Sequence, residues 1–344
     1  MEGIRIAVDV MGGDHAPQAI VEGICEYLRD HPESGILAVG KEKEIQRELK
    51  RNRPVPSDRV EIVDALEQIS MREHFFSYWR KREETSIKKA LDLVKNGQAR
   101  AMISAGNTGA IMALAKTVLG PLKSIDRPAL AIMIPTLKGN SLLVDVGANV
   151  DSKPRHLVQF ALMGKVYLEN VQGIPNPRIG LMSIGEEDVK GNELIKTTHK
   201  LLKALDINFI GNIEGREAYL GEADLIVTDG FTGNVTLKVA EGVVDVMLSM
   251  LKREIMSSIL SKIGFFFLKS SLRRIKKQLD YQEYGGALLL GVDGIVIIGH
   301  GRSSAKAIKS AINLSVRFMK ENVLEKISQE INTMQEVFKG LKYV

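Results

Sequence analysis

Glycine-rich polar loops are the part of this sequence whose residues could do chemistry. In the first of them, Gly12 and Gly13 would let the backbone approach a ligand closely, and Asp14 and His15 follow directly. Pro17 then suits the first turn of a helix. Taken alone, this loop is explained as well by a capped turn as by a ligand site.

Five further loops of the same kind follow short apolar runs along the chain. After residues 101–104, Gly106, Asn107 and Thr108 lead into a helical pattern, and free N–H groups at a helix N-terminus form a ready anion site. Ordinary N-capping is the alternative for these residues. Because six loops share this position, capping alone does not explain them, and they indicate a site for a small anion such as phosphate, with an oxyanion developing beside it. The other candidate site residues in these loops are Asn149, Lys190, Asp229, Gly230, Thr232, Asn234 and His300.

The same loops argue against nucleotide and metal chemistry. The pattern G-x-x-x-x-G-K-[ST] is absent, and no G-x-G-x-x-G follows the first apolar run, so a nicotinamide dinucleotide has little support. A single cysteine excludes a multi-cysteine site, and the histidines show no metal-binding spacing. We therefore expect no metal and no cofactor, and we interpret Cys25 as a buried structural thiol.

Composition bounds the partners and the location. The 344 residues are 44% hydrophobic and 26% charged, which is typical of a globular protein, and the net charge of +5 is too small to demand nucleic acid. Aromatic residues make up 5% of the chain, and no basic stretch interleaves them as a base-stacking surface requires. We find neither a signal peptide nor an apolar run of about 18 residues that could span a membrane. The expected location is cytoplasmic.

The elements that must position the loops follow from the apolar pattern. Short β-branched runs, such as 4–10 and 178–182, alternate with helical patterns over most of the chain. This alternation predicts a mostly parallel sheet covered on both faces, with the polar loops at the carboxyl ends of its strands. No low-complexity linker interrupts the chain, so we expect one α/β domain over 1–344.

One segment, 237–282, breaks the alternation with a helical pattern that should project from the sheet. Residues 255–279 contain no acidic side chain and combine apolar with basic residues. Such a segment suits a membrane interface, or the docking of an acidic carrier protein. A dimer-packing helix with a solvated basic face is the alternative. The predicted contact residues are Ile263, Phe265, Phe266, Phe267, Lys269, Arg273 and Arg274.

Seven motifs in their order resemble those of the bacterial phosphate acyltransferase family. They are DVMGGDHAP, SAGNTGA, DVGAN, IGEEDVKGNEL, DGFTGNV, EYGGALLLG and GHGRSSA, and the match runs from residue 4 to about 312. The sequence departs from the family pattern at Leu288, Gly299 and Arg302. The resemblance implies a three-layer αβα, Rossmann-like fold similar to phosphotransacetylases and isocitrate-dehydrogenase-type enzymes, and a homodimer.

The resemblance also implies an activity and partners. It implies transfer of an acyl group from acyl-acyl-carrier protein, or acyl-CoA, to orthophosphate, giving acyl phosphate for phospholipid synthesis. The product would feed a membrane-bound glycerol-3-phosphate acyltransferase, which favours attachment to the inner face of the cell membrane. Two alternatives stay open: a CoA-dependent phosphotransacetylase of short acyl groups, and a non-catalytic membrane-bound scaffold.

Roles for individual residues follow from the motifs and the reaction they imply. Lys190, His15 and Asn234 form the expected catalytic set. Lys190 would stabilise negative charge on phosphate or on the oxyanion, and His15 is the candidate proton donor to the leaving sulfur. Asn107 and Thr108 would bind phosphate. The remaining polar loop residues would shape the same pocket.

Overall fold

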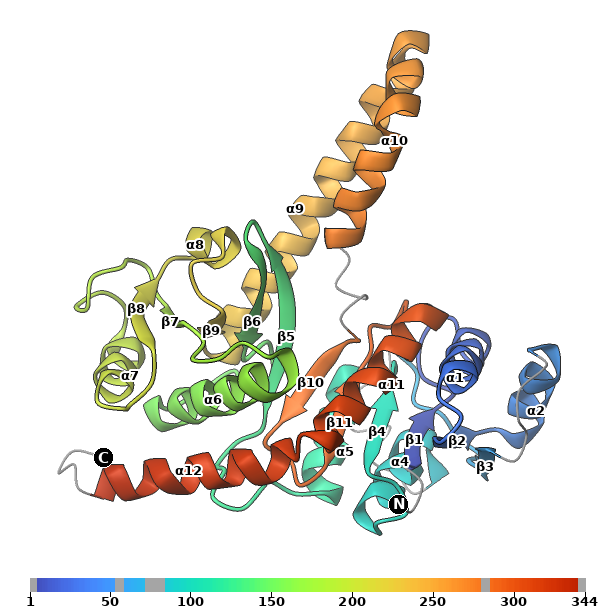
Figure 1. The fold of residues 1–344 in the computed structure, drawn as a ribbon, viewed down its shortest axis with the longest axis horizontal. Helices are drawn as coiled ribbons and strands as arrows, with labels where there is room; N and C mark the ends of the chain where they lie inside the picture. The colour runs from blue at the N-terminus through green and yellow to red at the C-terminus, as the bar shows by residue number, and fades with distance from the viewer. Residues whose placement is uncertain (1–4, 53–58, 72–83, 280–284, 340–344) are drawn as a thin grey trace.

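A computed structural model of the chain describes residues 5–52, 59–71, 84–279 and 285–339. Within these ranges, eleven strands form one sheet in the order β3-β2-β1-β4-β11-β10-β5-β6-β9-β7-β8 (Figure 1). The strands are β1 (Arg5–Asp9), β2 (Gly35–Gly40), β3 (Val60–Asp64), β4 (Ala101–Ser104), β5 (Ala129–Thr136), β6 (Gly139–Val144), β7 (Ile179–Met182), β8 (Phe209–Ile213), β9 (Leu225–Val227), β10 (Ala287–Leu290) and β11 (Ile295–Ile298).

Helices cover both faces of this sheet, which confirms the expected three layers. Alternate residues of β1 point to opposite faces: Ile6 and Val8 belong to one apolar core, and Ala7 belongs to the other. The helices are α1 (Gln18–Asp30), α2 (Glu42–Arg51), α4 (Ser86–Lys95), α5 (Thr108–Val118), α6 (Pro154–Tyr167) with the π-helix η3 (Leu168–Gln172), α7 (Glu193–Lys203), α8 (Gly215–Leu220), α9 (Gly230–Ser257), α10 (Ile259–Leu279), α11 (Ala305–Lys320) and α12 (Val323–Lys339).

The sheet reverses direction in its middle. The pairs β11–β10, β10–β5 and β5–β6 are antiparallel, while the strands on either side of this centre pair in parallel. Consequently β6, β9 and β7 run opposite to β1, β4 and β11. Val144, the last residue of β6, pairs with Ala131 of β5; Ala131 pairs with Leu288 of β10, and Leu288 pairs with Ile297 of β11. The carboxyl ends of β6 and β11 therefore lie at the same level of the sheet. Three strand spacings, roughly 14 Å, separate β6 from β11.

The helical pattern expected to project forms α9 and α10, which stand side by side as a two-helix arm (Figure 1). The helix begins at Gly230, earlier than the expected 237, because Asp229 caps it by accepting a hydrogen bond from the N–H of Thr232. Strands β8 and β10 and helix α8 are further elements that the sequence pattern did not predict. Among the described residues, no helix is long and apolar enough to span a bilayer.

Candidate functional site

A first cluster of polar loops joins the carboxyl ends of β1, β4 and β11. The N–H of Asp14 donates to the carbonyl of Gly301 at 2.7 Å, and the N–H of Gly299 donates to the carbonyl of Ser104 at 2.8 Å. Gly13 has φ +104°, and a Cβ there would lie 3.0 Å from the carbonyl oxygen of Gly301. This close packing of backbone on backbone makes the three loops one connected structure.

Asp14 and His15 are exposed in this cluster, and the loop after β4 lies against theirs. The side chain of Asn107 caps α5 by accepting a 3.0 Å hydrogen bond from the N–H of Ala110, and its amide donates to the carbonyl of Met71. The N-capping interpretation of Asn107 therefore fits its hydrogen bonds. Thr108 and Gly109 begin α5 and are exposed, whereas Ala110 and Ile111 of the same turn are buried. Gly106 contributes an N–H that donates to Ser104 Oγ at 3.0 Å.

His300 is the partly buried titratable group of the first cluster. Its Nδ1 accepts a 3.1 Å hydrogen bond from the N–H of Arg302, which leaves the proton of the neutral ring on Nε2. Burial lowers the pKa of His300 below 6.5. The charges that act on it come from Glu241, Lys238, Arg302 and Asp14, so helix α9 lies within electrostatic reach of this loop.

A second cluster follows β6 and is organised by Asp145, whose side chain is buried. Its Oδ1 accepts hydrogen bonds from the N–H groups of Leu130, Gly147 and Ala148, at 2.9 to 3.2 Å. Its Oδ2 accepts from the backbone N–H and the side-chain amide of Asn149, at 2.7 and 2.9 Å. Burial raises the pKa of Asp145 despite these donors. One carboxylate therefore fixes the whole D-V-G-A-N loop.

Helix α9 docks on this second loop through its first turn. The N–H of Gly230 donates to the carbonyl of Asn149 at 2.8 Å, and a Cβ at Gly230 would lie 2.6 Å from that oxygen. The amide of Asn149 also donates to the carbonyl of Pro128 at 2.7 Å. Asp229 accepts from both the N–H and the hydroxyl of Thr232. The hydrogen bonds recorded for Asn149, Asp229 and Thr232 thus hold loops and helix together, and their binding roles stay predictions.

Lys190 lies in the loop after β7 and is exposed. This loop is attached to the outer part of the sheet: Asp188 pairs with Lys203 at 2.8 Å, and the carbonyl of Glu187 accepts from Asn212 at 2.9 Å. Because β7 pairs with β9, the Lys190 loop is the neighbour of the second cluster. The charge-stabilising role of Lys190 stays a prediction.

Two charged residues on α9 were not predicted from the sequence. Lys238 Nζ and Glu241 Oε2 form an ion pair of 2.7 Å, and both charges act on His300. With Asn234, whose amide lies beside Gly147, they recur at the spacing of one helix face. Helix α9 therefore starts in the second cluster and carries a cation toward the first. The helical spacing of Asn234, Lys238 and Glu241, which begins in the D-G-F-T-G-N-V motif and continues beyond it, was the signal in the sequence.

Two other observations concern cysteine and metal-type side chains. Burial raises the pKa of the Cys25 thiol to about 11, which suits the expected structural role. In the ranges that the structure describes, no three His, Cys, Asp or Glu side chains gather as a metal site requires. The two loop clusters instead offer backbone N–H groups, amides, imidazoles and lysines.

These features define an α/β protein whose polar loops gather at the carboxyl ends of its strands, where ligands bind in folds of this class. A family model described as fatty acid synthesis protein matches residues 4–326, and the chain belongs to this family. The chain is 47% identical to the phosphate acyltransferase of Thermodesulfovibrio yellowstonii over 333 residues, 97% of this chain and 96% of that protein. It is 46% identical to the phosphate acyltransferase of Clostridium acetobutylicum over 329 residues, 96% and 99% of the two chains. The protein is therefore a transferase that acts on acyl groups and phosphate.

Solved structures support the fold. A phosphotransacetylase from Streptococcus pyogenes superposes with a TM-score of 0.62 at 15% identity, covering 92% of this chain and 94% of that one. A branched-chain phosphotransacylase from Enterococcus faecalis superposes with a TM-score of 0.54 at 14% identity, covering 91% and 98%. The expected likeness to phosphotransacetylases is confirmed at the level of the fold.

Proposed function

We propose that this enzyme transfers a fatty acyl group from acyl-acyl-carrier protein, or acyl-CoA, to orthophosphate, and that the acyl phosphate serves phospholipid synthesis. The near full-length identity of 47% to a phosphate acyltransferase carries the proposal. The family description, fatty acid synthesis protein, supports a fatty acyl group over a short one.

The reaction needs no covalent enzyme intermediate. A phosphate oxygen attacks the thioester carbonyl carbon, a C–O bond forms, the C–S bond breaks, and the leaving thiolate takes a proton. Phosphate is already a nucleophile at pH 7, and the buried Cys25 has no part in the reaction. The enzyme has to hold phosphate against the carbonyl and stabilise the tetrahedral oxyanion; losing one such donor costs roughly 3 kcal/mol.

The first cluster is the better place for orthophosphate. The exposed start of α5 at Thr108 offers backbone N–H groups, and His300 lies in the same cluster with its ring held by the N–H of Arg302. His15 is exposed beside them and is the candidate proton donor to sulfur. Lys190 is the candidate cation for the oxyanion, and Lys238, whose charge acts on His300, is the candidate cation for orthophosphate.

The arm is the proposed contact with the membrane and with the carrier protein. Ile263, Phe266 and Phe267 on α10 are 55%, 73% and 76% exposed, and the exposed Lys269 and Arg274 are their basic neighbours on this helix. Phe265 is partly buried, and the side chain of Arg273 lies outside the described residues. We propose a homodimer attached to the inner face of the membrane, close to a glycerol-3-phosphate acyltransferase.

Liposome flotation tests the membrane contact. Vesicles of anionic phospholipid should carry the wild-type protein upward, and the variant with Ile263, Phe266 and Phe267 changed to Ser should stay below. A Val239→Ser variant, changed at the base of the arm, serves as control. If the triple variant floats like the wild type, the membrane role is wrong; if size-exclusion chromatography shows it to be a monomer, these residues pack a dimer.

Thiol release tests the activity. Long-chain acyl-acyl-carrier protein is incubated with and without orthophosphate, the free carrier thiol is counted, and acyl phosphate is trapped with hydroxylamine. Release that requires phosphate and yields trapped acyl product supports the proposal. Activity confined to acetyl-CoA or other short acyl-CoA donors would replace it with a phosphotransacetylase of short acyl groups. No release with any donor would favour the scaffold.

A further inference from the structure

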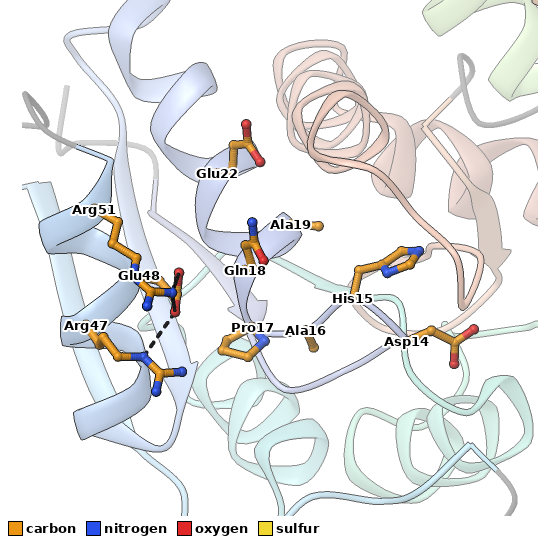
Figure 2. Close-up of a pocket in the computed structure, with 10 residues that line it drawn as sticks. All are labelled: Asp14, His15, Ala16, Pro17, Gln18, Ala19, Glu22, Arg47, Glu48 and Arg51. Carbon is orange, nitrogen blue, oxygen red and sulfur yellow. Dashed lines mark hydrogen bonds and ion pairs between the residues drawn. The ribbon is translucent and has the colours of Figure 1, made fainter.

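A cavity of about 490 Å³ lies beside the first cluster, between the β1 loop, the start of α1 and helix α2. Its size is that of a small-molecule site. Asp14 and His15 line one side, and Arg47 and Arg51 of α2 line the other. Figure 2 shows the two guanidinium groups and His15 on opposite sides of the chain turn at Pro17 that leads into α1.

The two arginines are only partly neutralised. Both pair with Glu48, whose side chain is 3% exposed: Arg51 Nη1 lies 2.9 Å and Arg47 Nε lies 3.2 Å from Glu48 Oε1. The side chain of Arg47 is 60% exposed, and that of Arg51 is 63% exposed. One buried carboxylate shared by two guanidinium groups leaves one positive charge and several N–H donors at the cavity. Arginine N–H groups in this fork arrangement match the oxygens of a phosphate group.

The cavity lining as a whole has three carboxylates against two guanidinium groups, but these charges are separated along the cavity. Glu48 is the one that the arginines hold, and Asp14 and Glu22 are the remaining two. Figure 2 shows Asp14 at the far side, next to His15, and Glu22 one turn along α1, apart from the guanidinium groups. The cavity is therefore divided into a basic end on α2 and a mixed end at the β1 loop.

An acyl thioester donor has the same division. Both acyl-carrier protein and CoA present the acyl group on a pantetheine arm, with the sulfur at one end and a phosphate ester at the other. We propose that this cavity binds the pantetheine arm of the donor, with Arg47 and Arg51 holding its phosphate and the sulfur directed to the His15 side. The inference rests on the proposed thioester chemistry and adds a site for the donor, separate from the orthophosphate.

Two small donors isolate the phosphate contact. Decanoyl-4′-phosphopantetheine and decanoyl-pantetheine differ only in that group, so the ratio of their kcat/KM values measures what the phosphate contributes. We expect the wild type to prefer the phosphorylated donor by about tenfold or more, the gain of one charge-assisted contact. Arg47→Ala and Arg51→Ala should each reduce this preference toward unity without changing kcat/KM for decanoyl-pantetheine.

Lys50→Ala is the matched control. Lys50 is exposed on the same helix, next to Arg51, and does not line the cavity, so its removal changes the net charge equally. It should keep the wild-type preference. Arg51→Ala removes one partner of the buried Glu48, so thermal unfolding of each variant is recorded to detect a loss of stability. Arg51→Gln retains a hydrogen-bond donor for Glu48 but has no positive charge, and it should lose the preference for the phosphorylated donor as well.

Three outcomes overturn the proposal. They are equal kcat/KM for the two donors in the wild type, a preference that survives Arg47→Ala and Arg51→Ala, and a rise in the KM for orthophosphate with both donors alike, which would assign the arginines to the other substrate. A wild-type protein that releases no thiol with either donor or with acyl-acyl-carrier protein contradicts the proposed function itself, and is thereby distinguished from these three.

Discussion

The hydroxyl of Ser104 donates a 2.6 Å hydrogen bond to Oδ2 of Asp9, and both residues are 1% exposed. Asp9 Oδ1 also accepts from the N–H of Met11 at 3.0 Å, and Ser104 Oγ accepts from the N–H of Gly106. The pair thus ties the loop after β1 to the loop after β4. Asp145 does the same for the loop after β6, so each half of the sheet holds its polar loops through a buried aspartate.

Asp9→Asn should change how stability depends on pH. Burial raises the pKa of Asp9 above 3.8, so the folded protein retains this proton where the unfolded chain has lost it. The contribution is present below pH 3.8 and is lost as the pH rises through the folded pKa, by about 1.4 kcal/mol for each pKa unit of the shift. The cost of Asp9→Asn should therefore be largest near pH 4 and shrink toward pH 7.

Urea unfolding of the wild type and of Asp9→Asn, at several pH values between 4 and 7.5, measures this difference. Glu61→Gln, which alters an exposed carboxylate on β3, is the control, and its effect should vary little with pH. A cost of Asp9→Asn that grows from pH 4 to pH 7 would contradict the raised pKa.

His300→Gln should alter the pH profile of the reaction. Burial lowers the pKa of His300, so the neutral ring with Nε2–H persists below pH 6.5. We expect kcat/KM of the wild type to fall when the ring gains a proton at lower pH, because the protonated Nδ1 can no longer accept the N–H of Arg302 that holds the ring in place. His300→Gln should lower kcat/KM by about 10² and remove that acid limb. His31→Gln, changed at the C-cap of α1, is the control; an acid limb retained in His300→Gln would reject the role.

Sequence patterns located the loops but not their arrangement. Strands such as β11 (Ile295–Ile298) were found because four consecutive apolar residues precede a polar turn. β8 (Phe209–Ile213) was missed because Gly211 and Asn212 interrupt its apolar run. Nothing in the residues of β10 (Ala287–Leu290) reveals that it pairs antiparallel on both sides. Since that pairing reverses the sheet, the division of six similar loops into two clusters could be known only from the fold.

For the candidate site, the sequence indicated which loops carry polar groups, and the roles of those groups stay predictions. Asp14, His15 and His300 come from distant parts of the chain and meet in one cluster, as the spacing of their motifs after apolar runs suggested. Lys238 was missed because a lysine in an amphipathic helix is usually a surface residue. Its significance depends on the direction in which α9 leaves the Asp145 loop, which is a tertiary property.

Lys190→Ala and Lys238→Ala should separate the two candidate cations. A cation that acts on the oxyanion lowers kcat when removed, by about 10² or more, whereas one that holds orthophosphate in the ground state raises its KM. We expect the first result for Lys190→Ala and the second for Lys238→Ala, because Lys238 shares its charge environment with His300. Lys252→Ala, farther along α9, should change neither parameter. Near-normal kinetics of Lys190→Ala in a folded protein would remove it from the catalytic set.

Cys25 should be unreactive in the folded protein. The side chain is fully buried, and burial raises its thiol pKa to about 11, so almost no thiolate exists at pH 8. 5,5′-Dithiobis(2-nitrobenzoic acid) should titrate the thiol in 6 M guanidinium chloride and react negligibly without denaturant. Cys25→Ala should retain full acyl transfer. Rapid labelling of the native protein, or loss of turnover in Cys25→Ala, would return Cys25 to the list of catalytic candidates.

Gly233→Ala and Gly242→Ala compare two positions on α9 that differ only in their surroundings. Replacing Gly by Ala in a helix interior gains about 0.5–1 kcal/mol at either position. At Gly242 a Cβ would meet nothing within 4 Å, so the gain should appear in full. At Gly233 the Cβ would overlap the carbonyl oxygen of Asp145, so the helix or the loop must shift, at a cost of about 1–3 kcal/mol or more. The free energy of unfolding, measured with urea, should therefore rise for Gly242→Ala and fall for Gly233→Ala.

Because a shift of α9 also moves Asn234 and Lys238, Gly233→Ala should lose turnover while Gly242→Ala keeps it. Equal stability and equal turnover in the two variants would show that the contact between α9 and the Asp145 loop does not position the site.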